Sequence, residues 1–193
     1  MTSPAVDAVA TVGAGPDALA HALATEAPWL WFLAPGARPR EDALDVLLAA
    51  VAPEGAAPPT VLAGLLVDEH GVPLERDLQA TPQLDAEAAV ELVRHRLLPI
   101  RSAGFQHCLV ARASFDRHGL PDHARFGPYA GHEWTARVLG DSAGYLVAAS
   151  VVELAAGAAP TGSFAQLPAA VRMLRTGAWS RGDAVRALRR AVL

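Results

Sequence analysis

Short apolar runs alternate with segments of helical periodicity along the chain. The apolar runs predict strands at about 7–12, 29–33, 60–67, 105–110 and 145–152. The helical pattern predicts helices at about 17–26, 39–48, 85–98, 114–118, 133–139, 167–175 and 181–192. Strands that alternate with helices indicate a layered α/β fold. We therefore expect one domain over residues 1–193, with a mainly parallel sheet flanked by helices and a C-terminal pair of helices at about 167–192.

Composition narrows the class of protein without naming a function. The chain has 193 residues and a net charge of -4, which gives no support for nucleic-acid binding. No apolar run reaches the roughly 18 residues of a membrane-spanning helix, and no signal peptide is visible, so we expect a cytoplasmic protein. The single cysteine, Cys108, lies in an apolar strand and is expected to be a buried side chain rather than a nucleophile.

A glycine pair follows the first predicted strand. Gly13-Ala14-Gly15 could hold a phosphate at the start of the next helix, or it could be a simple turn. The dinucleotide fingerprint needs a third glycine three residues later, and Ala18 stands there. The turn is the better interpretation, and we predict no cofactor.

The second strand leads into a segment with a recognisable layout. Trp29–Leu33 is followed by Ala34-Pro35-Gly36, then by Pro39 and a helical pattern that ends in Leu47-Leu48. This layout resembles the metal-site segment of family 2 glycosyltransferases of the GT-A type. In that family the strand ends in an Asp-x-Asp motif, and a helix that begins with proline closes with a Leu-Leu pair. The resemblance implies a GT-A-like fold and, in an active member, transfer of a sugar from a nucleotide sugar.

Later segments resemble the same family in the same order. They are the strand and turn at 104–115, the Gly-Leu-Pro-Asp run within 115–122, the acidic-aromatic helix at 133–137, the strand at 144–152 and a C-terminal segment at 173–180. The last is similar to the rhamnosyl- and galactofuranosyl-transferase branch. The likeness covers about residues 7–180 and implies that the family's N-terminal half is missing.

The resemblance fails where the family carries its chemistry. Ala34, Pro35 and Gly36 occupy the slot of the metal-binding motif, and the alignment places Ala130 and Gly131 in the slot of the acidic catalytic base. A hard cation needs oxygen ligands, and a base must accept a proton from the acceptor hydroxyl. None of these side chains does either, so we predict that no metal binds at 34–36.

Four neighbouring side chains are candidates for a role at such a site. His132 and Glu133 lie beside the vacant base slot; the alternatives are a solvated histidine and a carboxylate at a helix start. Trp134 could stack on a sugar ring or belong to the core. His107 could face a substrate pocket or be a hydrogen-bonded histidine of a strand. The spacing of the histidines matches no closed zinc site.

Three hypotheses follow from these residues. The first is a degenerate glycosyltransferase-like protein without metal-dependent transferase activity, which acts as a binding or interaction partner. The second is an active glycosyltransferase whose donor site is completed by unusual residues or by a partner chain. The third is an unrelated α/β protein. If the first half of the family fold is missing, an exposed sheet edge predicts a homodimer or a complex with an active glycosyltransferase.

Overall fold

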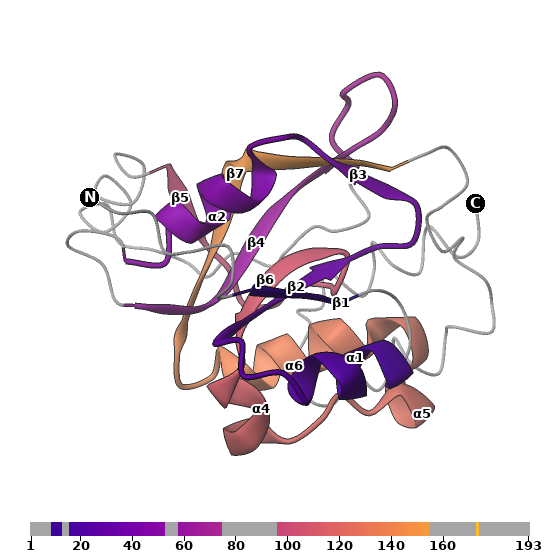
Figure 1. Cartoon of the computed structure of the whole chain (residues 1–193), viewed down its shortest axis with the longest axis vertical. Helices are drawn as coiled ribbons and strands as arrows, with labels where there is room; N and C mark the ends of the chain where they lie inside the picture. Colours follow the sequence, from indigo (N-terminus) through magenta and orange to yellow (C-terminus); the bar gives the residue numbers. More distant parts are fainter. Residues whose placement is uncertain (1–8, 13–15, 53–57, 75–95, 155–172, 174–193) are drawn as a thin grey trace.

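The computed structural model describes residues 9–12, 16–52, 58–74, 96–154 and 173 (Figure 1). Seven strands lie in these ranges: β1 (Val9–Val12), β2 (Trp29–Leu33), β3 (Ala37–Pro39), β4 (Pro59–Val67), β5 (Leu97–Pro99), β6 (His107–Ala111) and β7 (Ala143–Leu154). The helices are α1 (Pro16–Leu23), α2 (Ala43–Ala49), α4 (Ala113–His118), α5 (His123–Phe126), the 3₁₀ helix η3 (Gly127–Tyr129) and α6 (Ala130–Val138). The predicted α/β class and the main strands are confirmed.

All described strands belong to one sheet in the order β1-β2-β6-β4-β7-β3, with β5 also paired to β7. The pairs β1–β2 and β4–β7 are parallel, and the other pairings among the described strands are antiparallel. The prediction of a mainly parallel sheet is therefore wrong, and the sheet is mixed. The physical reason is that β6 lies between β2 and β4 and runs against both, while the short strands β3 and β5 both run against β7.

Helices cover both faces of the sheet (Figure 1). The apolar side chains of α2 pack on one face, in a cluster that includes Trp31, Leu62 and Leu109. On the opposite face a second cluster joins α1, α4 and α6 to the sheet. Its buried members include Leu19, Leu30, Phe32, Cys108, Val110, Phe115, Trp134 and Val138. Successive residues of β2 and β6 thus point into different clusters, as the alternation of a strand requires.

Two helix boundaries differ from the prediction. Pro39 does not open a helix but ends β3, and α2 begins only at Ala43. Residues 97–99, expected at the end of a helix, form β5, and Arg96 before it has a positive φ of 54°. In both places the sheet offers β7 as a neighbour, and pairing with it overrides the local preference for a helix.

Other predictions lie outside the described residues. They are the Gly13-Ala14-Gly15 turn, most of the helix at 85–98, and the C-terminal helices at 167–192, of which only Met173 is described. The single-domain organisation of residues 1–193 stays a prediction. No helix in the described part of the chain is both long and apolar enough to cross a lipid bilayer.

Candidate functional site

The segments 34–36 and 130–131, which the family resemblance assigns to the metal motif and the base, meet at one segment of the chain, just before and at the start of β6. The backbone N–H of Ala34 donates to the carbonyl of Gln106 at 2.7 Å. Gly131, in the first turn of α6, packs against Phe105 on the other side. The structure therefore brings together the end of β2, residues 105–107 and the start of α6, which the sequence places far apart. We take this junction as the candidate functional site.

The turn after β2 has the shape of a tight backbone reversal. Ala37 N–H donates to the carbonyl of Ala34 at 3.1 Å, and Gly36 has a φ of +72°, a conformation that glycine adopts without strain. Ala34, Pro35 and Gly36 carry no side-chain oxygen, whereas a hard divalent cation takes about six oxygen ligands. These three residues therefore do not fit the metal that the family resemblance implies. Among the described residues, no three His, Cys, Asp or Glu side chains cluster closely enough to hold a metal ion.

Packing closes the space beside Gly131, where the family resemblance would place the base. A Cβ atom at position 131 would lie 2.9 Å from the backbone nitrogen of Phe105 and 3.0 Å from its ring. Phe105 is itself held by Phe32, with ring centroids 4.1 Å apart and nearly parallel planes. Ala130 beside it is fully buried. A side chain longer than glycine at position 131 therefore requires the 105 segment to move.

The helix α6 begins at Ala130, three residues before the predicted start, and both His132 and Glu133 lie in its first turn. Both Glu133 carboxylate oxygens accept from the Arg137 guanidinium, at 3.2 and 3.3 Å, one turn further along the helix. Arg137 also donates to the backbone carbonyl of His118 and so ties α6 to the end of α4. His132 is buried, which corrects the expectation of a solvated histidine in a turn.

Trp134 is fully buried, in the cluster of side chains that packs α6 against the sheet. Its ring stacks on Phe115 with centroids 4.2 Å apart, and its indole N–H donates to the carbonyl of Gly119 at 2.6 Å. The adjacent Thr135 hydroxyl accepts from the Ala103 N–H at 2.9 Å and lies 2.8 Å from the Ala103 carbonyl. In this arrangement Trp134 exposes no ring face to a ligand, and α6 is fastened to the segment before β6.

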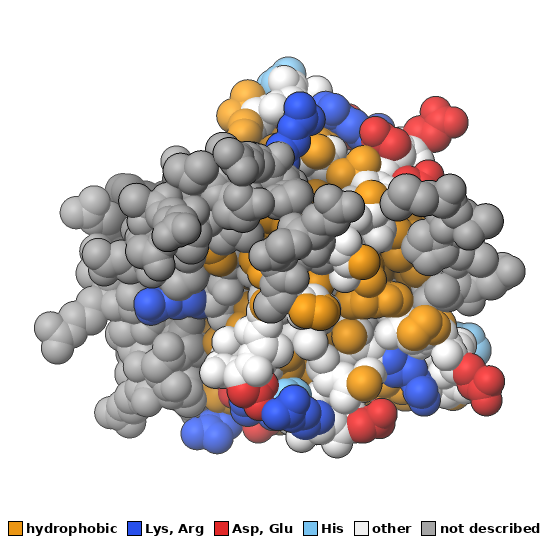
Figure 2. Space-filling model, turned by 90° about the vertical axis from the view of Figure 1, so that its left-hand side faces the viewer, with side chains coloured by type: hydrophobic (Ala, Val, Ile, Leu, Met, Phe, Trp, Pro, Cys, Tyr) orange, Lys and Arg blue, Asp and Glu red, His pale blue; other side chains and the backbone are white. Residues whose placement is uncertain are grey.

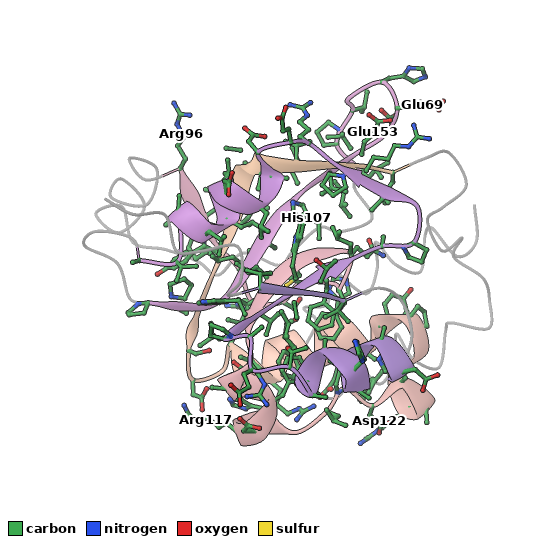
Figure 3. All side chains as sticks on the ribbon, viewed as in Figure 1. Glu69, Arg96, His107, Arg117, Asp122 and Glu153 are labelled. Carbon is green, nitrogen blue, oxygen red and sulfur yellow. The ribbon has the colours of Figure 1, made fainter. Side chains whose placement is uncertain are left out.

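His107 is buried at the centre of the molecule, on the α2 side of the sheet (Figure 3). Its Nδ1 accepts from the Trp31 indole N–H at 3.2 Å, and its Nε2 lies 2.9 Å from the Ser150 hydroxyl. The Ser150 hydroxyl in turn donates to the carbonyl of Ala43 at 2.6 Å. Because an indole nitrogen only donates, the ring must be neutral with its proton on Nε2. Burial lowers the pKa of His107 from 6.5 to about 4, and a hydrogen bond with the backbone of Ser150 offsets part of that effect.

Two features of the sheet make room for this chain of hydrogen bonds. Gly64 of β4 lies against the ring, and a Cβ there would be 2.0 Å from His107 Nε2. The register between β4 and β7 shifts at the same level: Gly64 pairs with Val147, but Leu65 pairs with Val151. The extra residues 148–150 form a bulge that turns Ser150 inward. Sequence reasoning singled out His107 but missed Trp31, Ser150 and Gly64, because their contact is made by non-neighbouring strands.

Comparisons with known proteins concern the fold. No protein-family model matches the sequence, and no curated protein matches it significantly. Among solved structures, the chain is similar to a crystal structure of GalNAc-T7 with UDP, GalNAc and Mn²⁺, with a TM-score of 0.51 and 14% sequence identity. The match covers 83% of this chain but 33% of the other, so this chain corresponds to about a third of that protein's length. At this identity the likeness concerns the fold alone: a mixed α/β fold, with its sheet flanked by helices, similar to that of a GT-A glycosyltransferase.

Proposed function

We propose that this protein is a degenerate member of the family 2 glycosyltransferases, related to the rhamnosyl- and galactofuranosyl-transferase branch, that lacks metal-dependent transferase activity and acts as a binding or interaction partner. The observation that carries the proposal is the closed base slot, where the backbone and ring of Phe105 fill the space beside Gly131. A base must reach the attacking hydroxyl to remove its proton. At this position the chain has neither a carboxylate nor room for one.

The metal slot supports the same interpretation. Ala34-Pro35-Gly36 offers only backbone carbonyls to a cation, and the Ala34 carbonyl already accepts from Ala37. In metal-dependent transfer the cation neutralises charge on the leaving diphosphate. We therefore expect nucleotide sugars to bind weakly or not at all with Mn²⁺ present.

Calorimetric titration of the purified protein with a panel of nucleotide sugars, with and without Mn²⁺, tests the proposal. We expect no metal-dependent heat of binding at micromolar protein concentration. The proposal fails if Mn²⁺ or Mg²⁺ binds at micromolar affinity and a substitution such as Gly36→Ala abolishes that binding. A matched control is Gly71→Ala, which alters a glycine with the same sign of φ in the exposed turn after β4.

The alternative, an active glycosyltransferase with an unusual donor site, has one specific observation in its favour. Glu133 is a buried carboxylate two residues from the base slot. Its ion pair with Arg137 occupies both oxygens, and an active enzyme would have to open that pair. If sugar transfer is detected and Glu133→Gln abolishes it while Asp122→Asn, at an exposed helix cap, does not, the alternative replaces our proposal.

Assembly is part of the proposed role. In the described sheet β1 is a terminal strand that pairs with β2 only. Figure 2 shows hydrophobic side chains gathered across the middle of one face, with charged side chains above and below them. Sheet edges and apolar surface of this kind favour association. We propose a homodimer or a complex with an active glycosyltransferase, and light scattering at micromolar concentration tests the first form directly.

A further inference from the structure

The chain of hydrogen bonds around His107 fixes the direction of every donor in it. The Trp31 indole has a proton and no lone pair to offer, so it donates to Nδ1. Nε2 then donates to the Ser150 hydroxyl, and that hydroxyl donates to the Ala43 carbonyl. The chain links β2, β6, the β7 bulge and the first residue of α2 through buried atoms. Each of the three donated protons, on Trp31, His107 and Ser150, therefore has one acceptor in this network of hydrogen bonds.

A second proton on the ring would have no acceptor. It would sit on Nδ1 and point at the Trp31 N–H, so that two donors would face each other across 3.2 Å in the core. The ring cannot move toward β4 to avoid this contact, because it already lies directly against Gly64. Burial strongly disfavours a charged imidazolium here, and the hydrogen bond with the Ser150 backbone offsets only part of that effect.

Charged groups on the surrounding elements do not compensate. Strands β2 and β4 carry no ionisable side chain, and Cys108, the next residue on β6, points into the opposite cluster. On α2 the ionisable side chain is the exposed Asp45, and on β7 they are Tyr145 and Glu153. Glu153 lies opposite Arg38 in the register between β7 and β3. Figure 3 places Glu153 and the other labelled charged side chains at the periphery, away from His107.

We propose that His107 is an acid-sensitive switch: protonation of its ring breaks the bond to Trp31, and the contact between β2, the β7 bulge and α2 opens. The inference does not depend on the proposed function, because it rests on the core contacts alone. Gln106, the neighbour of His107, accepts from Ala34. Opening therefore also loosens the turn at 34–36 of the candidate functional site.

The size of the effect follows from the two protonation equilibria. In the closed state the pKa of His107 is about 4, and in an opened state the ring regains its ordinary 6.5. Proton binding to the open form then raises the population of that form about 30-fold at pH 5 relative to pH 7.5. The increase is confined to openings that expose the ring, which makes it separable from general acid denaturation.

The experiment is NMR on the full chain between pH 8 and 4.5, with ring nitrogens, the Trp31 indole N–H and amide exchange followed together. We expect His107 to stay neutral with its proton on Nε2 down to pH 5.5. Exchange of the Arg40 amide, which donates to Val151 beside the bulge, should rise about 30-fold between pH 7.5 and 5 after correction for intrinsic rates. The Leu139 amide at the end of α6 should change less than about threefold.

Two variants complete the test. His107→Asn keeps an oxygen acceptor for Trp31 but cannot titrate, and it should lose the pH-dependent increase. His21→Asn, at an exposed helix position, should keep it. A His107 that titrates between pH 6 and 7, a proton on Nδ1 at neutral pH, or equal acceleration of both amides would overturn the inference. If His107→Asn does not fold, the wild-type titration decides alone.

Discussion

Gly64→Ala tests whether the ring of His107 is fixed in place by its hydrogen bonds. The new Cβ would lie 2.0 Å from Nε2, 2.2 Å from Cδ2 and 2.8 Å from Cε1 of the ring. Carbon atoms in contact normally stay about 3.5 Å apart, so the ring would have to move by more than about 1 Å. It cannot do so and keep both the 3.2 Å contact to Trp31 and the 2.9 Å contact to Ser150.

The cost can be worked from these contacts. Loss of the acceptor for the buried Trp31 N–H costs about 1–3 kcal/mol, and loss of the donor to Ser150 about 1 kcal/mol. Overpacking adds about 1–3 kcal/mol. Replacing glycine by alanine in a strand returns about 0.5–1 kcal/mol of backbone entropy. We expect a net loss of about 4 kcal/mol, a large part of the 5–15 kcal/mol typical of a domain.

Urea unfolding followed by far-ultraviolet circular dichroism measures this loss without relying on Trp31 fluorescence. Gly140→Ala is a matched control, since its Cβ would meet only the carbonyls of Arg137 and Ala136, at 3.3 and 3.9 Å. It should change stability by less than about 0.5 kcal/mol. In a His107→Ala background, Gly64→Ala should cost at least about 2 kcal/mol less than in the wild type. A cost below 1 kcal/mol, or an equal cost in both backgrounds, refutes the reasoning.

Three further outcomes are expected. Gly131→Asp should lower the free energy of unfolding in urea by about 3 kcal/mol or more, because it forces a carboxylate against the backbone of Phe105. Unchanged stability would show that position 131 has room for a carboxylate and would contradict the proposal. Thr135→Val should cost about 2 kcal/mol, because it leaves the buried N–H of Ala103 unpaired, and Thr25→Val at a half-buried helix end serves as its control. The free energy of unfolding of the wild type should fall by about 2 kcal/mol from pH 7.5 to pH 5. The unfolded chain binds a proton at His107 below about pH 6.5, whereas the folded chain binds it only near pH 4. A stability that does not change over this range contradicts the reasoning.

The sequence by itself determined the strands that carry the core. Trp29–Leu33 was predicted as a strand and is β2 with the same bounds, because five apolar residues in a row have few other ways to be buried. The strands at 60–67 and 145–152 were found with ends shifted by one or two residues. The sequence also shows that residues 34–36 and 130–131 carry no side-chain oxygen, whereas their assignment to the metal and base positions of the family stays a prediction.

The tertiary structure decided how these pieces meet. Strand direction follows from which strands become neighbours, so a local apolar pattern could not tell that β6 runs against β2 and β4. The same holds for β3 and β5, which become strands because β7 offers a pairing edge. Local pattern depends on neighbours along the chain, whereas these pairings join residues that are far apart in it.

The roles of individual side chains depended most on long-range contacts. Trp134 and Glu133 were candidates for substrate chemistry from their positions beside Gly131, and their partners became clear only when α4 and Phe115 were placed against α6. His107 owes its neutral state to Trp31 and Ser150, which stand 76 and 43 residues away in the sequence. A residue type shows what chemistry a side chain is capable of, but burial and hydrogen-bond partners decide its protonation state, and only the folded chain supplies them.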